Sequence, residues 1–195
     1  MEKPGAMLRV ARLVSILVHP VVVMAAAALV ATDDGPSPHL RLQALAAVAA
    51  AAAGVMLYSV RKTRSGRWAH VDASHRHERA QLNRFASWLL FVLAAGLAVA
   101  GAHVGIVATI ALSGGIVFAG HLLRRWLKSS LHVAFAAFAT GIAWPHVPIA
   151  GVLLAATVAV AWSRLALRRH LPAELLSGAM LGVAAGAALQ AIVRG

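Results

Sequence analysis

The stretch VGIVATIALSGGIVFAGH, residues 104–121, contains no Lys, Arg, Asp or Glu and approaches the length that a bilayer demands of a helix. About 20 consecutive apolar residues span the hydrocarbon core. Similar apolar segments can be drawn along the rest of the chain, at residues 13–32, 42–60, 86–101, 131–147, 148–166 and 172–193. Several are short for a span, so the sequence predicts an all-α, polytopic transmembrane helical bundle with six or seven spans, forming one membrane-embedded domain over residues 1–195.

The composition supports a membrane protein. Of the 195 residues, 61% are hydrophobic and only 12% are charged, and the mean hydropathy is +0.79. A soluble helical protein needs polar faces that recur about every 3.6 residues, and these segments lack them. The chain has no cysteine, which excludes disulfides and thiolate metal sites. The bias toward Ala, Val, Gly and Arg is typical of a GC-rich genome, so we expect a protein of a bacterial inner membrane.

Two pairs of segments are predicted to form tight hairpins. The first turn lies at GAHVG, residues 101–105, and the second at WPHVP, residues 144–148. Pro145 and Pro148 cannot both continue a helix without loss of backbone hydrogen bonds. The first segment raises a different question, because residues 1–34 have the basic start and apolar run of a signal peptide. Its apolar run is long for that purpose, and we favour an uncleaved membrane anchor.

The basic residues are distributed unequally between the two ends of the predicted helices. The formal net charge is +12, and of the 18 Lys and Arg only Arg41 and Arg194 fall on the side opposite the N-terminus. The positive-inside rule therefore makes the N-terminal side, here called side A, cytoplasmic. The basic residues are interleaved with apolar segments rather than gathered on a soluble surface with stacking aromatics, so nucleic acid is not an expected partner.

Three polar clusters occur at side-A junctions between segments. The first is HVDASHRHERAQLNR, residues 70–84, with Asp72, Arg76 and Arg79; the second is RRWLKSSLH, residues 124–132, with Lys128, Ser130 and His132; the third is SRLALRRHLPAELLSG, residues 163–178, with Ser163, Arg164, His170 and Glu174. If the segments alternate in direction, the three clusters meet at one membrane face.

Together the clusters hold groups suited to a phosphoryl centre. Arg binds phosphate oxygens bidentately and Lys adds a point charge. Helices are predicted to begin near Ser130 and near Pro172, and helix N-termini favour anions. Glu174 lies four residues after His170, close enough to orient the imidazole. A histidine held by a carboxylate can serve as a nucleophile or a general base.

Each cluster also has a simpler interpretation when it is taken alone. Arginines at cytoplasmic helix ends commonly act as membrane anchors. His70, His75 and His77 could bind a metal, although their spacing fixes no ligand geometry. His19, within the first apolar segment, is interpreted as a packed side chain or a buried hydrogen-bonding group.

The three clusters resemble the three motifs of the type 2 phosphatidic acid phosphatase superfamily. The third motif of that family is Ser-Arg, five residues, His, three residues, Asp; Ser163, Arg164 and His170 match it, with Glu174 in place of Asp. KSSLH, residues 128–132, resembles the second motif through Ser130 and His132. DASHRHERA, residues 72–80, resembles a variant of the first motif, with Asp72 where lysine is usual and Arg79 in the place of the family's arginine. Ala80, Ser129 and Leu131 depart from the family pattern.

The resemblance implies a mechanism without a metal or other cofactor. It implies that His170 attacks phosphorus, that His132 protonates the leaving oxygen, and that Glu174 orients His170. It assigns phosphate binding to Arg79, Lys128, Ser130 and Arg164, with Asp72 at the first-motif position and Arg76 or Lys128 supplying the cation that is missing there.

The predicted function is therefore that of a membrane lipid phosphatase with a cytoplasmic active site. Its substrate would be a phosphomonoester or pyrophosphate of a lipid: phosphatidic acid, phosphatidylglycerol phosphate, or a polyprenyl phosphate type, including polyprenyl phosphoribose phosphate. The alternatives are a non-catalytic protein that binds or transports anionic lipid, and a relative of the vanadate-dependent haloperoxidases, which share the same anion site. The sequence leaves the oligomeric state open.

Overall fold

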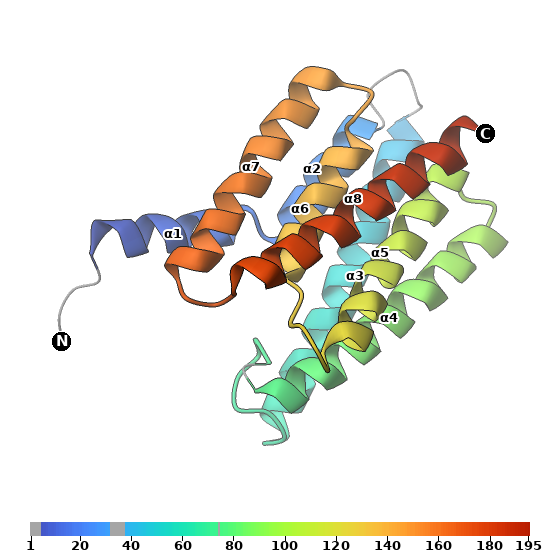
Figure 1. Ribbon diagram of the computed structural model, residues 1–195. Helices are drawn as coiled ribbons and strands as arrows, with labels where there is room; N and C mark the ends of the chain where they lie inside the picture. The colour runs from blue at the N-terminus through green and yellow to red at the C-terminus, as the bar shows by residue number, and fades with distance from the viewer. Residues whose placement is uncertain (1–4, 32–37, 74) are drawn as a thin grey trace.

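The computed structural model describes residues 5–31, 38–73 and 75–195, and all regular structure in these residues is helical (Figure 1). The prediction of an all-α protein is confirmed. The helices are α1 (Ala6–Leu17), α2 (Pro20–Ala31), α3 (Pro38–Arg64), α4 (Arg76–Val99), α5 (Val104–Leu123), α6 (Leu131–Ile142), α7 (Val147–Ala166) and α8 (Pro172–Arg194).

Five of these helices, α3, α4, α5, α7 and α8, are long and apolar enough to cross a membrane. The bent pair α1 and α2 raises the count to six if the two are taken as one span. These helices identify the chain as an integral membrane protein, with five or six candidate spans in the described residues where six or seven were expected. Large apolar side chains on their outer faces, such as Val92, Val158 and Met180, are more than half exposed in the isolated chain, as lipid-facing groups are.

Two predicted segments differ from the observed helices, in both cases at prolines. The segment 13–32 is broken between Leu17 and Pro20, where the chain bends by 50°. Pro20 disfavours helical backbone at His19 and lacks an N–H group, so a new helix starts there. The segment 131–147 ends as a helix at Ile142, ahead of Pro145 and too early for a span.

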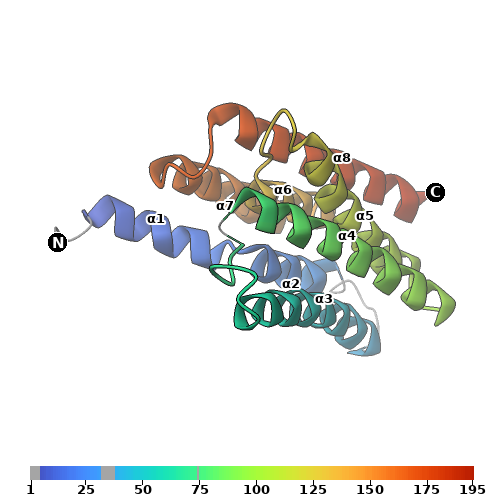
Figure 2. The same cartoon turned by 90° about the horizontal axis from the view of Figure 1, so that it is seen from below.

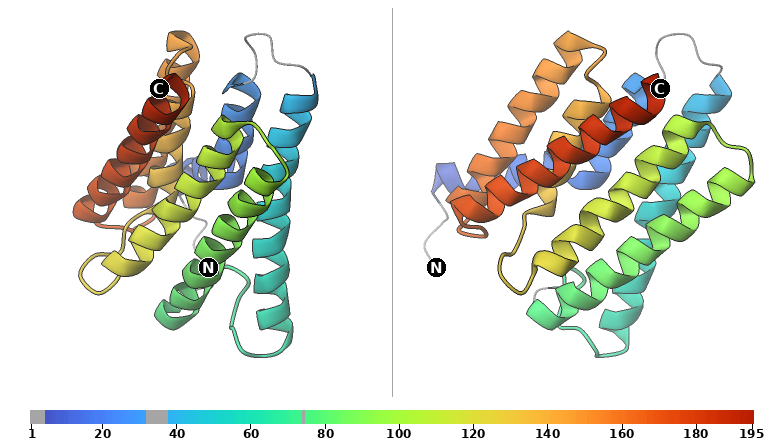
Figure 3. Two further views of the ribbon diagram at one scale, coloured as in Figure 1. Left: turned by 90° about the vertical axis from the view of Figure 1, so that its right-hand side faces the viewer. Right: turned by 45° about the vertical axis from the view of Figure 1, so that its right-hand side comes forward.

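The helices after α2 alternate in direction along the bundle, as Figure 3 shows for the α4–α5 and α6–α7 hairpins. Both predicted hairpin turns are confirmed, and Gly101 supplies a positive φ of 72° at the first. The junctions α3–α4, α5–α6 and α7–α8 therefore lie toward the same end of the bundle. This is the end predicted to be side A.

α6 is the central helix, and it packs against α2, α5, α7 and α8. Ala134, Phe138 and Ala139 on this helix have no exposed surface. α8 approaches α6 closely because Gly178, Gly182 and Gly186, spaced four residues apart, face it. A Cβ at Gly178 would lie 2.5 Å from the carbonyl oxygen of Ser130, and one at Gly182 would overlap that of Ala134. Small residues at such spacing allow close helix contact in lipid.

We expect Gly182→Ala to destabilise the protein by about 1–3 kcal/mol, since the new methyl group forces α8 away from α6. Thermal unfolding in detergent measures the effect. Gly115→Ala on α5 is the matched control, because a Cβ there meets no described atom within 4 Å and alanine favours the helix by up to about 1 kcal/mol. Equal stability of the two variants would contradict the close α6–α8 contact.

Candidate phosphate site at three helix N-termini

The α7–α8 junction places His170 between two helices through a tight helix termination. The backbone N–H groups of Arg168 and Arg169 donate to the carbonyls of Leu165 (2.8 Å) and Arg164 (3.0 Å), and Arg168 adopts a φ of +52°. This hydrogen-bond pattern is a Schellman motif with arginine where glycine is usual. The chain then reverses, and α8 starts with Pro172 at its first position.

His170 and Glu174 form a nearly buried pair. Nδ1 of His170 lies 2.9 Å from Oε2 of Glu174, and the two side chains are only 7% and 14% exposed. The same carboxylate oxygen accepts the backbone N–H of Leu171 at 3.1 Å. Since a carboxylate accepts, Nδ1 must donate, and the lone pair of a neutral His170 ring is on Nε2. The pairing expected from the sequence is present, with the tautomer that a nucleophilic imidazole needs.

Glu174 also connects α8 to the start of α6. Its backbone carbonyl accepts the N–H of Ser130 at 3.0 Å. Ser130 is fully buried at the N-cap of α6, but its hydroxyl caps no N–H group. Within the described part of the chain, Oγ of Ser130 has no hydrogen-bond partner. Such an unpaired buried hydroxyl costs about 1–3 kcal/mol, which a ligand oxygen would recover.

Arg164, in the last turn of α7, is 8% exposed. Its Nη1 donates to Oγ of Ser15 on α1 at 2.8 Å, and neighbouring Ser163 donates to the carbonyl of Ala11 at 2.6 Å. Nε of Arg164 is buried and finds no partner among the described residues. A buried guanidinium with a free donor is a strong attraction for an anion.

Lys128 and Arg79 add two further cations. Nζ of Lys128 donates to the carbonyl of Arg169 at 2.9 Å, which joins the α5–α6 and α7–α8 junctions. Desolvation and the neighbouring charge of Arg79 are the main causes that lower the pKa of Lys128. Arg79, in the first turn of α4, is half-buried and within electrostatic range of Lys128. The first and second clusters therefore approach one another through these two side chains.

The rest of the first cluster lies farther out. Asp72 and Arg76 are both exposed, and Nη2 of Arg76 donates to the carbonyl of Arg124 at 3.0 Å. The α3–α4 loop is fixed by Glu78, whose carboxylate accepts the N–H groups of Ala69 (2.9 Å) and His75 (3.0 Å). Arg76 thus joins the start of α4 to the end of α5 in this structure, and its hydrogen bond goes to that helix end and not to His170.

The metal interpretation of the histidine-rich loop finds no support in side-chain placement. The rings of His75 and His77 stack with their centroids 5.9 Å apart. Within residues 5–31, 38–73 and 75–195, no three His, Cys, Asp or Glu side chains gather closely enough to hold a metal ion.

His132 and His19 bring a third helix start to the site. His132 lies in the first turn of α6, half-buried, and its ring contacts that of His19 edge to face with centroids 5.3 Å apart. Nδ1 of His19 accepts the N–H of Val21 at 3.3 Å, at the start of α2. Arg164 and Asp72 are within electrostatic range of His19. From the sequence, His19 was interpreted as a packed side chain or a buried hydrogen-bonding group, and Ser15 was not singled out; the proline after His19 was the one local signal.

The N-termini of α2, α6 and α8 thus converge on the same small region. Each contributes a positive dipole end, although the first N–H groups of α2 are already bonded to His19. Oγ of Ser130 and Nε of Arg164 are buried donors that lack partners among the described residues. This arrangement is suited to a tetrahedral oxyanion such as phosphate. A separate cavity of about 200 Å³ lies at the opposite end of the bundle, near His103, His146 and Gln190.

Comparison of the chain with protein-family models, with curated proteins and with solved structures found no match.

The environment of His170 makes a prediction about its titration. Burial, followed by the charge of Lys128, lowers the pKa of His170, while the hydrogen bond to Glu174 raises it. We expect NMR of histidine-labelled protein to show a pKa below the ordinary value of about 6.5, so that the ring is neutral at pH 7. Lys128→Met should raise this pKa and Glu174→Gln should lower it further. Arg194→Gln, at the other end of the bundle, is the control; shifts of the opposite sign would contradict the site.

Replacement of Ser130 tests the anion site directly. Without ligand, Ser130→Ala should unfold at the same or a higher temperature than wild type, because it removes an unpaired buried hydroxyl. With inorganic phosphate added, its gain in melting temperature should be smaller than that of wild type.

Ser129→Ala is the matched control for this test, because the Ser129 hydroxyl contacts that of Ser177. It should destabilise the protein and leave the phosphate-induced gain unchanged. If phosphate raises the melting temperature of the two variants equally, the Ser130 hydroxyl does not bind phosphate.

Proposed function

We propose that the protein is a membrane lipid phosphatase that hydrolyses a lipid phosphomonoester or pyrophosphate through a phosphohistidine intermediate at the cytoplasmic face. The observation that carries the proposal is the His170–Glu174 pair, at 2.9 Å, beside the unpaired buried donors of Ser130 and Arg164. An anion site needs the donors alone. The carboxylate-held imidazole adds a nucleophile.

In the proposed first step, Nε2 of His170 attacks phosphorus and the bond from phosphorus to the leaving oxygen breaks. The proton on Nδ1 stays hydrogen-bonded to Glu174, which stabilises the charge that the ring acquires. His132 is proposed to give its proton to the leaving oxygen. Burial lowers the pKa of His132 to about 3, so its protonated form depends on the negative charge of the bound phosphate beside the ring. The products are a phosphohistidine and the lipid alcohol, or the shorter phosphate where the substrate is a pyrophosphate.

In the second step, a water molecule attacks phosphorus, the His132 ring that lost its proton in the first step takes up the proton of the water, and Nε2 of His170 leaves. The product is inorganic phosphate. Arg79, Arg164, Lys128 and Ser130 are the groups proposed to hold the equatorial oxygens; Arg79 is within electrostatic range of Lys128. Fixed donors of this kind stabilise charge in the transition state, and loss of one commonly costs about 10²–10³ in rate.

Three observations favour a lipid as the substrate. The site lies at the ends of helices that cross the membrane, the outer faces of those helices are apolar, and its end of the bundle carries nearly all the basic residues. A lipid can place its phosphate at this level while its tail stays among the acyl chains. The basic side is expected to be cytoplasmic, so the substrate is proposed to be exposed on the inner leaflet. Phosphatidic acid, phosphatidylglycerol phosphate and polyprenyl phosphates, including polyprenyl phosphoribose phosphate, all meet these conditions.

The resemblance of residues 72–80, 128–132 and 163–174 to the motifs of the type 2 phosphatidic acid phosphatases supports the same proposal. A protein that only binds or transports anionic lipid would use the same cations. It would have no need of a nearly buried imidazole oriented by a carboxylate, and for this reason we rank it second.

The decisive measurement is phosphate release by purified protein in detergent with EDTA, from a panel of these lipid phosphates. We expect metal-independent release that falls below detection in His170→Ala. Glu174→Gln should retain measurable activity at a rate lower by about 10²–10⁴, since the ring remains but loses its orienting carboxylate.

Binding of the same lipids to His170→Ala is the control. If wild type and His170→Ala release no phosphate from any lipid but bind them equally, the site is a binding site and the enzymatic proposal fails. If wild type releases phosphate and His170→Ala still does so, His170 is not the nucleophile.

A further inference from the structure

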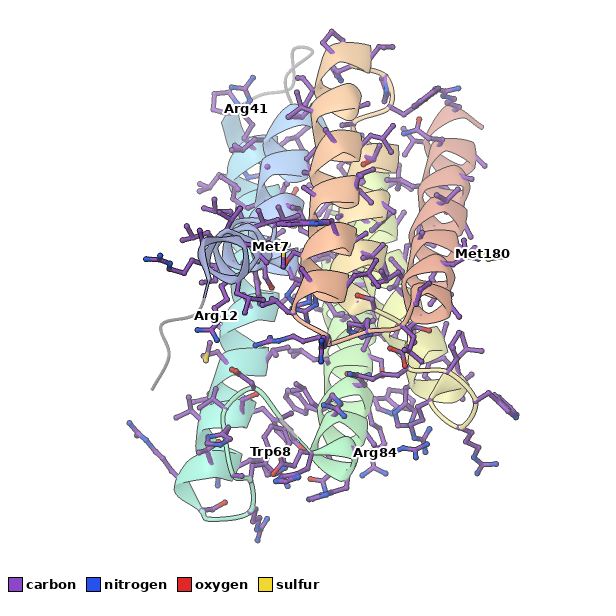
Figure 4. All side chains as sticks on the ribbon, turned by 60° about the vertical axis from the view of Figure 1, so that its left-hand side comes forward. Met7, Arg12, Arg41, Trp68, Arg84 and Met180 are labelled. Atoms are coloured by element: carbon purple, nitrogen blue, oxygen red, sulfur yellow. The ribbon has the colours of Figure 1, made fainter. Side chains whose placement is uncertain are left out.

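Helix α1 differs from the other helices in its direction and in its surface. It bends away from α2 by 50°. It extends sideways from the bundle (Figures 1 and 2). Figure 4 looks along α1 while α7 runs up the page, so that α1 crosses the direction of the spans. α1 has 12 residues, and Ala11 and Ser15 are its buried positions.

Three faces can be distinguished around α1. At about 100° per residue, the face toward α7 contains Ala11 and Ser15, and Arg12 and Arg9 lie roughly 80° and 140° from its centre. The remaining face is apolar: its members Met7, Val10, Leu13 and Leu17 are 58%, 49%, 59% and 67% exposed, while Ile16, 66% exposed, lies between the two arginines. Each face therefore has a different chemical character.

The position of α1 along α7 fixes its depth. α1 contacts α7 at Ser163 and Arg164, in the last turn before the site. α7 has 20 residues and is about 30 Å long, the thickness of the hydrocarbon core. α1 is therefore near the side-A boundary of the membrane. In Figure 4, Arg12 is on the side of α1 nearer the end of the bundle that carries Trp68 and Arg84.

We propose that α1 lies in the plane of the membrane interface. Its exposed faces bind the anionic phospholipid surface of the side-A leaflet. The apolar face is buried among acyl chains near the headgroups, and Arg9 and Arg12 contact lipid phosphates. Apolar area on one side and arginine on the other are the features of an interfacial helix. The charge of the surface matches the basic character of this end of the chain.

The contacts of α1 link its position at the membrane to the candidate phosphate site. Ser15 on α1 is the hydrogen-bond partner of Arg164, and the Ala11 carbonyl holds Ser163. Directly after α1 the chain reaches His19, which contacts His132. By holding α1, the membrane surface thereby positions Ser163, Arg164 and His19 around the candidate phosphate site. The orientation of α1 itself does not depend on the proposed phosphatase activity and can be tested without it.

The chain has no cysteine, so single cysteines can be introduced for spin labelling of the full-length protein in nanodiscs. Labels at Val10, Leu13 and Leu17 should lie at one shallow depth, accessible to oxygen and protected from a water-soluble nickel chelate. Labels at Arg9 and Arg12 should be accessible to the chelate. Val152, Val158 and Leu165, exposed on α7, provide a depth ladder.

Two results would overturn the proposal. If α1 is the outer part of a span, depth will change by about 10 Å between Val10 and Leu17, following the helical rise of 1.5 Å per residue. If the apolar face meets water or another copy of the chain, the labels at Val10, Leu13 and Leu17 will show chelate access, or spin–spin broadening that depends on labelling stoichiometry.

The role of anionic lipid is tested with the double variant Arg9→Gln, Arg12→Gln, labelled at Leu13. In discs that contain phosphatidylglycerol, we expect the balance between the seated and lifted helix to shift by about thirtyfold toward the lifted state, the effect of two basic residues near such a surface. In discs of phosphatidylcholine alone the variant and its parent should agree. The control is Arg125→Gln on the α5–α6 loop; a thirtyfold shift there too, or none in the double variant, would refute a specific role for the α1 arginines.

Discussion

Glu174 makes the contact on which the rest of the site depends. Its carboxylate binds the His170 ring and the Leu171 N–H group, and its backbone carbonyl binds the N–H group of Ser130. One residue thus ends the α7–α8 loop, starts α8 and fixes the start of α6 against it. The glycines that follow on α8 maintain this approach, because Gly178 lies directly over the Ser130 carbonyl. The geometry of the candidate phosphate site is in this sense a consequence of how closely α6 and α8 can pack.

The site brings the buried guanidinium of Arg164 and the exposed ammonium group of Lys128 close together, at a free-energy cost that the fold offsets only in part. Arg164 uses Nη1 on Ser15, while Nε and the Ser130 hydroxyl are left unpaired within the described residues. Cations held close together and desolvated lower one another's pKa, as Lys128 shows. An entering phosphate would satisfy the donors and neutralise the repulsion at once. Binding energy of this kind is available without rearrangement, which is what preorganised stabilisation of a transition state requires.

Local sequence patterns predicted those features of the fold that depend on residues close together in the chain. The apolar runs gave the long helices, the glycine and proline turns gave the two hairpins, and the four-residue spacing gave the His170–Glu174 pair. The break at His19 was missed because hydropathy does not register that Pro20 ends one helix and starts another. The contact of Arg164 with Ser15 joins residues 149 positions apart, and no pattern in a single sequence specifies it. The position of the α2 N-terminus at the site depends on the same packing, so it could not be predicted from the sequence either.

The glutamate at position 174 has a physical explanation in the structure. It is the third residue of α8, where a glutamate side chain reaches back to the N–H of the residue before the helix in the manner of a capping box. The same oxygen is 2.9 Å from His170 and 3.1 Å from the Leu171 nitrogen. An aspartate is shorter by one methylene and would have to draw the loop inward to make both contacts. The longer side chain therefore lets Pro172 start α8 while His170 stays in the loop, with Nδ1 toward the carboxylate and Nε2 away from it. The glutamate, where the motif that this stretch resembles has aspartate, thus keeps a carboxylate against His170.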